Sequence, residues 1–116
     1  MEWKRKKYYD NGELEFEGEY LNGKRNGIGN EYYDNGELKF EGEYLNGKRN
    51  GKGKKYDIIN GKLIFEGEYF NGKRNGKGKE YYDNGKLKYE GEYLNEERNG
   101  KGKEYDYDGK FMKGNI

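Results

Sequence analysis

One 14-residue stretch recurs along this chain every 24 or 25 residues, and that repeat restricts the possible folds more than any other feature. Its fullest form spans residues 40–53, with copies at 16–29 and 65–78 and a looser copy at 89–102. Units of this size cannot bury a hydrophobic face alone and are stabilised by their neighbours. We therefore expect a repeat array whose function belongs to the array and not to one set of residues.

Along the first part of each copy, apolar residues or glycine alternate with charged residues. In the first copy Leu14, Phe16, Gly18 and Tyr20 fall on one face of an extended segment, and the glutamates between them fall on the other. Alternation with a period of two is the pattern of a half-buried β-strand. No helical periodicity competes with it, and glycine is spaced through every unit. Each unit is therefore predicted to consist of strands.

Asn-Gly pairs mark the turns between these strands. Eleven such pairs occur, and Asn-Gly is favoured in tight hairpin turns because both residues tolerate positive φ. The chain is therefore predicted to be all-β, a meander of about ten short antiparallel strands built from 24–25-residue hairpin repeats. We expect a capping half repeat at 1–12, repeats at 13–36, 37–61, 62–85 and 86–109, and a terminal cap or truncated repeat at 110–116.

The register of the first connection stays open between two alternatives. It is either a two-residue turn at Asn22-Gly23 or a six-residue loop over residues 22–27. The tight turn would place Phe16 opposite Gly29 and Glu17 opposite residue 28. In the later units it would place Glu41 opposite Lys52 and Glu66 opposite Lys77. An aromatic ring over glycine is a favourable cross-strand pairing.

Three departures from the repeat have structural interpretations. Trp3 stands where later units have glycine, and we expect it to cover the end of the stack as a cap. The third unit is one residue longer at Ile58-Ile59, which predicts a bulge or an enlarged turn. Glu96-Glu97 replaces the Gly-Lys of the other units.

Composition separates this chain from disordered proteins and from most enzymes. Charged residues make up 41% of it and the net charge is +1, but 14 Tyr, 5 Phe and 1 Trp favour an ordered, thin structure. The sequence contains no Cys, His, Ser or Thr, so thiolate metal sites, the commonest general base and the usual nucleophiles are excluded. We predict no enzyme activity, no cofactor and no metal.

Other motifs have structural explanations. The glycine-rich tract at 47–54 looks like a phosphate loop, but no helix follows it. Asp106–Gly109 resembles a fragment of a calcium loop without the remaining ligands. Carboxylate pairs such as Glu41 and Glu43 recur on a face that also carries lysine, which favours a solvated charge row over acid–base chemistry. Residues 1–7 are basic without an apolar region behind them, and no apolar run approaches a membrane span of roughly 18 residues, so a cytoplasmic protein is expected.

The repeat resembles the MORN repeat (membrane occupation and recognition nexus). That pattern runs aromatic-Glu-Gly-Glu-aromatic, then Asn-Gly-Lys, then Gly-x-Gly, as in residues 40–53 here. It is especially similar to the variant MORN repeat, whose Tyr-Tyr-x-Asn-Gly-Lys-Leu stands at residues 81–87. Departures are Glu96-Glu97 and the asparagines at positions where many members carry histidine, which are Asn26, Asn50, Asn75 and Asn99.

The resemblance implies a single-layer twisted antiparallel sheet with glycines and aromatics lining one face. It also implies a non-catalytic protein-binding or scaffold module. The alternative that it offers is an antitoxin or immunity protein that inhibits a toxin by binding. A further alternative is a peripheral binder of anionic lipid, although lipid binding does not follow from the fold.

Glycines and aromatics are the first candidate residues. The structural glycines are expected to be Gly18, Gly27, Gly29, Gly42, Gly51, Gly53, Gly67, Gly76, Gly78, Gly91, Gly100 and Gly102. The aromatic face is expected to form a continuous strip of Phe16, Tyr20, Phe40, Tyr44, Phe65, Tyr69, Tyr89 and Tyr93. Left exposed, this strip would be an interaction surface. Equally, sheet curl and stacking on glycine could satisfy the rings within one chain.

A basic rim is the second candidate. A meander places alternate turns on opposite sides of the sheet, so one rim should carry Lys24, Arg25, Lys48, Arg49, Lys73, Arg74 and Arg98. This rim could contact an acidic protein or anionic lipid, or it could be a solubilising row of loops. A protein partner of unknown identity and a homodimer through the aromatic face or the edge strands are both expected possibilities. Nucleic acid is unlikely because the glutamate rows would repel phosphates.

Overall fold

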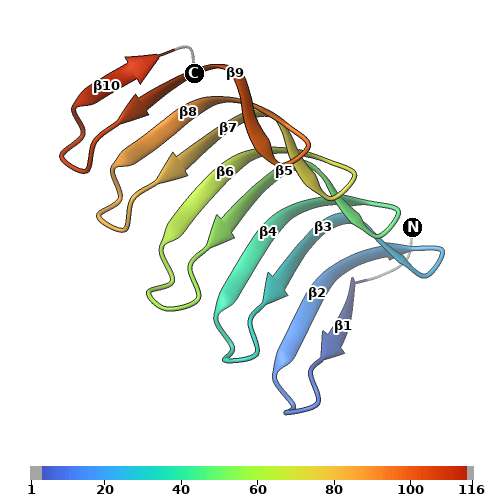
Figure 1. Cartoon of the computed structure of the whole chain (residues 1–116). Helices are drawn as coiled ribbons and strands as arrows, with labels where there is room; N and C mark the ends of the chain where they lie inside the picture. Colours follow the sequence, from blue (N-terminus) through green and yellow to red (C-terminus); the bar gives the residue numbers. More distant parts are fainter. Residues whose placement is uncertain (1–3, 115–116) are drawn as a thin grey trace.

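A computed structural model describes residues 4–114, which form ten antiparallel strands in one open sheet (Figure 1). Strands neighbour one another in chain order from β1 to β10, as the meander prediction required. They are β1 (Lys4–Tyr8), β2 (Leu14–Leu21), β3 (Lys24–Tyr32), β4 (Leu38–Leu45), β5 (Lys48–Tyr56), β6 (Leu63–Phe70), β7 (Lys73–Tyr81), β8 (Leu87–Leu94), β9 (Glu97–Tyr105) and β10 (Phe111–Gly114). The predicted cap Trp3 lies outside the described residues.

The sheet is a single curved layer, with extents of 45 × 27 × 17 Å. In Figure 1 the strands bend along their length and the turns gather in two rows on opposite sides. Residues 4–114 include no helix, and so none with the length and apolar character that a membrane crossing needs.

Two-residue turns join β2 to β3, β4 to β5, β6 to β7 and β8 to β9. Leu21 lies opposite Lys24, and between them Asn22 and Gly23 have φ angles of 52° and 78°. Positive φ at both central residues is the turn geometry that suits the twist of a hairpin. The tight-turn alternative is therefore the one that the chain adopts.

A bulge follows each tight turn. Tyr20 lies opposite Arg25 but Gly18 lies opposite Gly29, so β3 has two more residues than β2 between these pairs. Within this bulge Gly27 has a φ of 100°, a conformation that costs glycine little. The same shift recurs between β4 and β5, β6 and β7, and β8 and β9.

The bulge changes the register that the sequence predicted. Phe16 lies opposite Glu31 and not Gly29, and Glu17 lies opposite Asn30 and not Ile28. The two extra residues of the bulge cause this error. Phe16 still covers Gly29 diagonally, since a Cβ added to Gly29 would lie 2.5 Å from the Cζ atom of the ring.

The longer third unit is accommodated in its turn. Asp57 N donates to Lys62 O across this turn, whereas Tyr33 N donates to Glu37 O in the second unit. Ile59 is 91% exposed at its tip. An enlarged turn was one of the two predicted outcomes, and the flanking strands β5 and β6 keep their pairing with each other.

Hydrogen bonds between neighbouring units connect the turns along both rims. The Tyr9, Tyr33 and Tyr82 hydroxyls each donate to a backbone carbonyl 23 residues later. At the other rim Gly47 N donates to Arg25 O, and Gly72 N donates to Arg49 O. Each unit therefore depends on its neighbours, as expected for a repeat array.

Candidate binding surfaces

The aromatic rings form the core of the sheet. Phe16, Phe40, Phe65, Tyr44, Tyr69, Tyr89 and Tyr93 are at most 5% exposed, and Tyr20 packs against them partly buried. Successive rings meet edge to face at centroid separations of 5.2–5.9 Å, a preferred geometry for aromatic pairs. Of the two interpretations of the aromatic face, ring packing within one chain is the one observed, and the expected exposed strip is absent.

Arginines cover the outer side of these rings. The guanidinium carbons of Arg25, Arg49, Arg74 and Arg98 lie 4.0, 4.0, 5.1 and 4.2 Å from the centres of the Phe16, Phe40, Phe65 and Tyr89 rings. A cation over a ring face is attracted by the ring quadrupole. We call this side of the sheet the ring face. A partner approaching it meets guanidinium groups before it meets the rings.

The predicted basic rim is therefore only half right. Lys24, Lys48 and Lys73 are exposed beside the Asn-Gly turns, but the four arginines fold away from the rim onto the ring face and are partly buried. The reason is that each arginine lies directly opposite a tyrosine of the core, as Arg49 does with Tyr44. Sequence reasoning placed these arginines by their position next to a turn and missed their strand partners.

Carboxylates on the ring face hold the arginines in place. Arg49 donates to Glu31 from Nε at 2.9 Å and from Nη2 at 3.1 Å, and the Tyr44 hydroxyl donates to Glu31 at 2.5 Å. Burial opposes the charge of Glu31, but these hydrogen bonds outweigh it, and the pKa of Glu31 lies below its ordinary value. Arg98, Glu80 and Tyr93 repeat this arrangement two units later, with the pKa of Glu80 lowered likewise.

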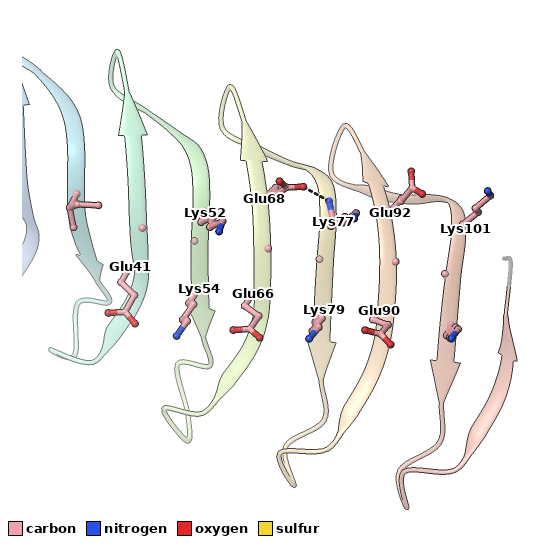
Figure 2. Close-up of a pocket in the computed structure, with 18 of the residues that line it drawn as sticks. Glu41, Lys52, Lys54, Glu66, Glu68, Lys77, Lys79, Glu90, Glu92 and Lys101 are labelled. Carbon is pink, nitrogen blue, oxygen red and sulfur yellow. Dashed lines mark hydrogen bonds between the residues drawn. The ribbon is translucent and has the colours of Figure 1, made fainter.

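The opposite side of the sheet is hollowed into a groove of about 1060 Å³. We call this side the groove face. Its floor is glycine backbone, because one glycine lies between the two glutamates of β4, β6 and β8 and between two lysines of β5, β7 and β9. Figure 2 shows side chains in two rows on either side of this floor. Rows that are two residues apart along a strand are separated by roughly 6.6 Å.

Charge in the groove is arranged in stripes along the strands. From β5 to β9 each strand carries the same charge in both rows, β4 contributes Glu41 to one row, and the sign alternates from one strand to the next (Figure 2). Cross-strand pairs such as Glu66 with Lys79 and Lys77 with Glu92 follow from the register. The charged residues that line the groove are Glu41, Lys52 and Lys54, Glu66 and Glu68, Lys77 and Lys79, Glu90 and Glu92, and Lys101 and Lys103. Glu43 on β4 continues the stripe pattern beyond this lining.

Several glutamates of these stripes already have internal partners. Glu43 and Glu68 accept hydrogen bonds at 2.9 and 2.7 Å from the backbone N–H of Lys52 and Lys77, where the bulge exposes it. Glu41 accepts from the Tyr56 hydroxyl at 2.6 Å, and Glu66 accepts from Tyr81 in the same way. Burial and then the hydrogen bond to glutamate raise the pKa of Tyr56 to about 12, so its hydroxyl stays a donor.

The groove lysines have no such partners. Within residues 4–114 none of the six groove lysines has a carboxylate within 4.0 Å of its ammonium group, and all six are exposed. Long lysine side chains in water gain little from pairing with glutamates across a strand. Their charges are therefore available to a ligand in the groove.

An apolar row borders the groove next to the two-residue turns that join β2 to β3, β4 to β5, β6 to β7 and β8 to β9. Strand alternation places each of its members on the groove face, two residues beyond a groove glutamate. The members are Leu21, Leu45, Phe70 and Leu94, which are 39%, 50%, 63% and 50% exposed. The sequence contains this row, but the predicted binding residues did not include it.

Comparison with protein families matches this repeat over most of the chain. The MORN repeat matches residues 16–37, 40–58 and 89–114, and the MORN repeat variant matches residues 3–22 and 74–95. This chain belongs to the MORN repeat family. The resemblance seen in the sequence is thus confirmed. A comparison with curated proteins gives no match. MORN proteins are generally non-catalytic binding modules, and this MORN array is a repeat-based binding or scaffold module.

Two departures within the MORN array compensate for each other. Position 55 is lysine where the neighbouring units have Glu31 and Glu80, so Arg74 lacks the carboxylate that Arg49 has. Glu96 replaces a turn glycine and lies 3.1 Å from Arg74 Nε. It does so with a φ of 82°, which is strained for a residue with a side chain. Glu96 was identified from the sequence as a departure, whereas Lys55 was not, and only the structure shows that the two lie near the same arginine.

Proposed function

We propose that this MORN array binds a protein partner along its groove face and holds an elongated amphipathic segment there. The observation that carries the proposal is the exposed apolar row next to unpaired groove lysines. Large apolar side chains in one exposed row usually mark an interaction surface. Full burial of a leucine or phenylalanine side chain contributes about 1.5–3 kcal/mol, so the row would supply affinity and the charge stripes would supply specificity.

The spacing of the charge stripes favours a helical segment. Neighbouring strands lie about 4.8 Å apart, so the sign of the groove charge alternates over that distance. A helix lying across the strands advances about 5.4 Å per turn, whereas side chains on one face of an extended strand recur about every 6.6 Å. A helix with acidic and basic residues on alternate turns therefore matches the stripes better than an extended strand.

Paired charge-reversal variants test the proposal. The protein is immobilised, and partners are captured from a lysate of its source cell and identified by mass spectrometry. Lys77→Glu with Lys79→Glu reverses two groove lysines, and Lys48→Glu with Lys73→Glu makes the same change of charge at the rim. We expect a partner that the wild type and the rim variant retain and the groove variant loses. Retention by the groove variant, or no specific capture by the wild type, would contradict the proposal.

An antitoxin or immunity protein is one form that this function would take. In that case the captured partner is an enzyme that harms the cell, and the groove variant no longer inhibits it in a growth assay. A scaffold role instead predicts a partner with no toxic activity. Both forms use the same surface, so the capture experiment distinguishes them by the identity of the partner.

An anionic membrane is a second candidate ligand, supported by a different observation. Leu21, Leu45 and Phe70 lie opposite the exposed Lys24, Lys48 and Lys73 at the turns. Each such lysine near an anionic surface contributes about 1 kcal/mol. Co-sedimentation with phosphatidylserine vesicles tests this candidate, and binding should then be lost in the rim variant and kept in the groove variant. The protein proposal predicts no sedimentation of either.

A further inference from the structure

The third unit leaves three hydrogen-bond donors together without the carboxylate that its neighbours have. In the second unit Glu31 lies opposite Phe40 and accepts from Tyr44 and Arg49. In the fourth unit Glu80 lies opposite Tyr89 and is bound in the same way. These two glutamates show that this position on the ring face accommodates a carboxylate group.

The register places Lys55 at the equivalent position. Lys55 lies opposite Phe65, and Tyr69 lies opposite Arg74 on the next pair of strands. Lys55, Tyr69 and Arg74 therefore occupy the corners that Glu31, Tyr44 and Arg49 occupy in the second unit. The difference is that position 55 carries a lysine ammonium group in place of a carboxylate. All three side chains are therefore hydrogen-bond donors.

Arg74 shows that Glu96 replaces the missing carboxylate only in part. Its Nε atom is buried and has no hydrogen-bond partner, although Glu96 Oε1 lies 3.1 Å away. In Arg49 and Arg98 the same Nε atom donates to Glu31 and Glu80 at 2.9 Å. An unsatisfied buried donor of a charged group is costly, and one carboxylate oxygen at the position of Glu31 Oε2 would satisfy it.

Tyr69 and Lys55 also lack acceptors. Within the described residues the Tyr69 hydroxyl donates to no acceptor and Lys55 has no ion pair within 4.0 Å. The first unit has a lysine at the same position, but there Glu15 lies 3.7 Å from Lys7. Ile64 stands at the position of that glutamate beside Lys55.

The surroundings of Lys55 are positive. Burial lowers the pKa of Lys55, and the charges of Arg49 and Lys39 lower it further; Glu96 opposes them, and Arg74 adds a smaller lowering effect. Lys55 is partly buried. A ligand that brings negative charge to this point would satisfy three donors and relieve the repulsion between the cations.

We propose that Lys55, Tyr69 and Arg74 form a binding site for one carboxylate group supplied from outside this chain. The group would lie between these three side chains and accept the hydrogen bonds that the carboxylates of Glu31 and Glu80 accept in the neighbouring units. Its chemistry is that of acetate or of a glutamate side chain. The site is on the ring face, so it is independent of the groove.

The test is a titration of the isotope-labelled protein with sodium acetate at constant ionic strength, followed by NMR. We expect saturable shifts in the amide signals of residues 55, 69 and 74, with those of residues 31, 44 and 49 unmoved as the internal control. In Lys55→Glu the protein's own carboxylate fills the site, and acetate should bind at least about tenfold more weakly. Tyr69→Phe should weaken binding while leaving the fold intact.

Two further probes identify the class and the source of the carboxylate. Glutamate blocked at both backbone ends represents a side chain of another protein; tighter binding than acetate supports that source, and equal binding supports a small free carboxylate. Phosphate is expected to bind more weakly than either. Shifts that do not saturate, equal binding to Lys55→Glu, or a preference for phosphate would overturn the proposal.

Discussion

The guanidinium carbon of Arg49 lies 4.0 Å from the centre of the Phe40 ring. This contact explains how one layer of sheet keeps an aromatic core out of water without a second layer. The glycine row supports the ring from one side, since a Cβ added to Gly42 would lie 2.9 Å from the Phe40 Cζ atom. The arginine covers the other side, and Glu31 holds the arginine.

Arg49→Ala should therefore destabilise the fold by about 2–4 kcal/mol, because it uncovers Phe40 and leaves the charge of Glu31 partly buried without its partner. Arg49→Lys should lose less stability, since lysine keeps the charge, although it lacks the planar stacking and the two-point hydrogen bond. Urea denaturation followed by tyrosine fluorescence gives both values. Lys48→Ala, at the exposed neighbouring position, is the matched control and should change stability by less than about 0.5 kcal/mol.

The glycine row predicts a second effect. A Cβ at Gly42 would lie 2.5 Å from the Lys52 carbonyl oxygen and 2.7 Å from the Gly53 Cα atom, both of which are backbone atoms that cannot turn aside. Gly42→Val should lower stability by more than about 1 kcal/mol. Thermal unfolding measures it, with Gly114→Ala as the control, because the nearest atom to a Cβ there is 3.5 Å away. Equal melting temperatures of the two variants would contradict the assignment of faces.

Glu31 and Glu80 predict how stability depends on pH. Their pKa values lie below the ordinary 4.5, so the stability they contribute is present above that value and is lost as the pH falls through their lower, folded-state pKa values. In Glu31→Gln with Glu80→Gln we expect lower stability at neutral pH and a smaller loss in acid. Chemical denaturation across this pH range tests it. Parallel pH curves for variant and wild type would show that these carboxylates are not held by Arg49 and Arg98.

Positions 55 and 96 should be coupled energetically. Lys55→Glu restores the carboxylate of the neighbouring units and should stabilise the fold by about 1 kcal/mol. Glu96→Gly alone removes the partner of Arg74 and should destabilise it. In the Lys55→Glu background the same change should be neutral or stabilising, because only the relief of the positive φ remains. A double-mutant cycle measures this coupling, and purely additive effects would contradict it.

Much of the fold could be predicted because local chemistry determines it. Asn22-Gly23 specifies a tight turn whatever surrounds it, and the alternation around Phe16 assigns the two faces. The bulge at Gly27 could not be predicted in the same way. Glycine permits a positive φ without requiring it, so the two-residue shift in register depends on the packing of the strands.

The candidate sites were less predictable because they depend on contacts between units. Arg49 lies beside a turn in the sequence, yet its place over Phe40 follows from the cross-strand pairing with Tyr44. Glu96 is 22 residues from Arg74 and appears in the sequence only as a departure from the repeat. The alternation of side chains predicted an aromatic face. Its burial could not be predicted, because it depends on where the arginine side chains lie.

The measurement that tests the central claim most directly is acetylation footprinting of the lysines with and without the captured partner. If the groove face is the binding surface, Lys77 and Lys79 should react several-fold more slowly in the complex, while Lys24, Lys48 and Lys73 at the rim keep their rates. Protection of the rim lysines with unchanged reaction of the groove lysines would contradict the account and would assign binding to the rim.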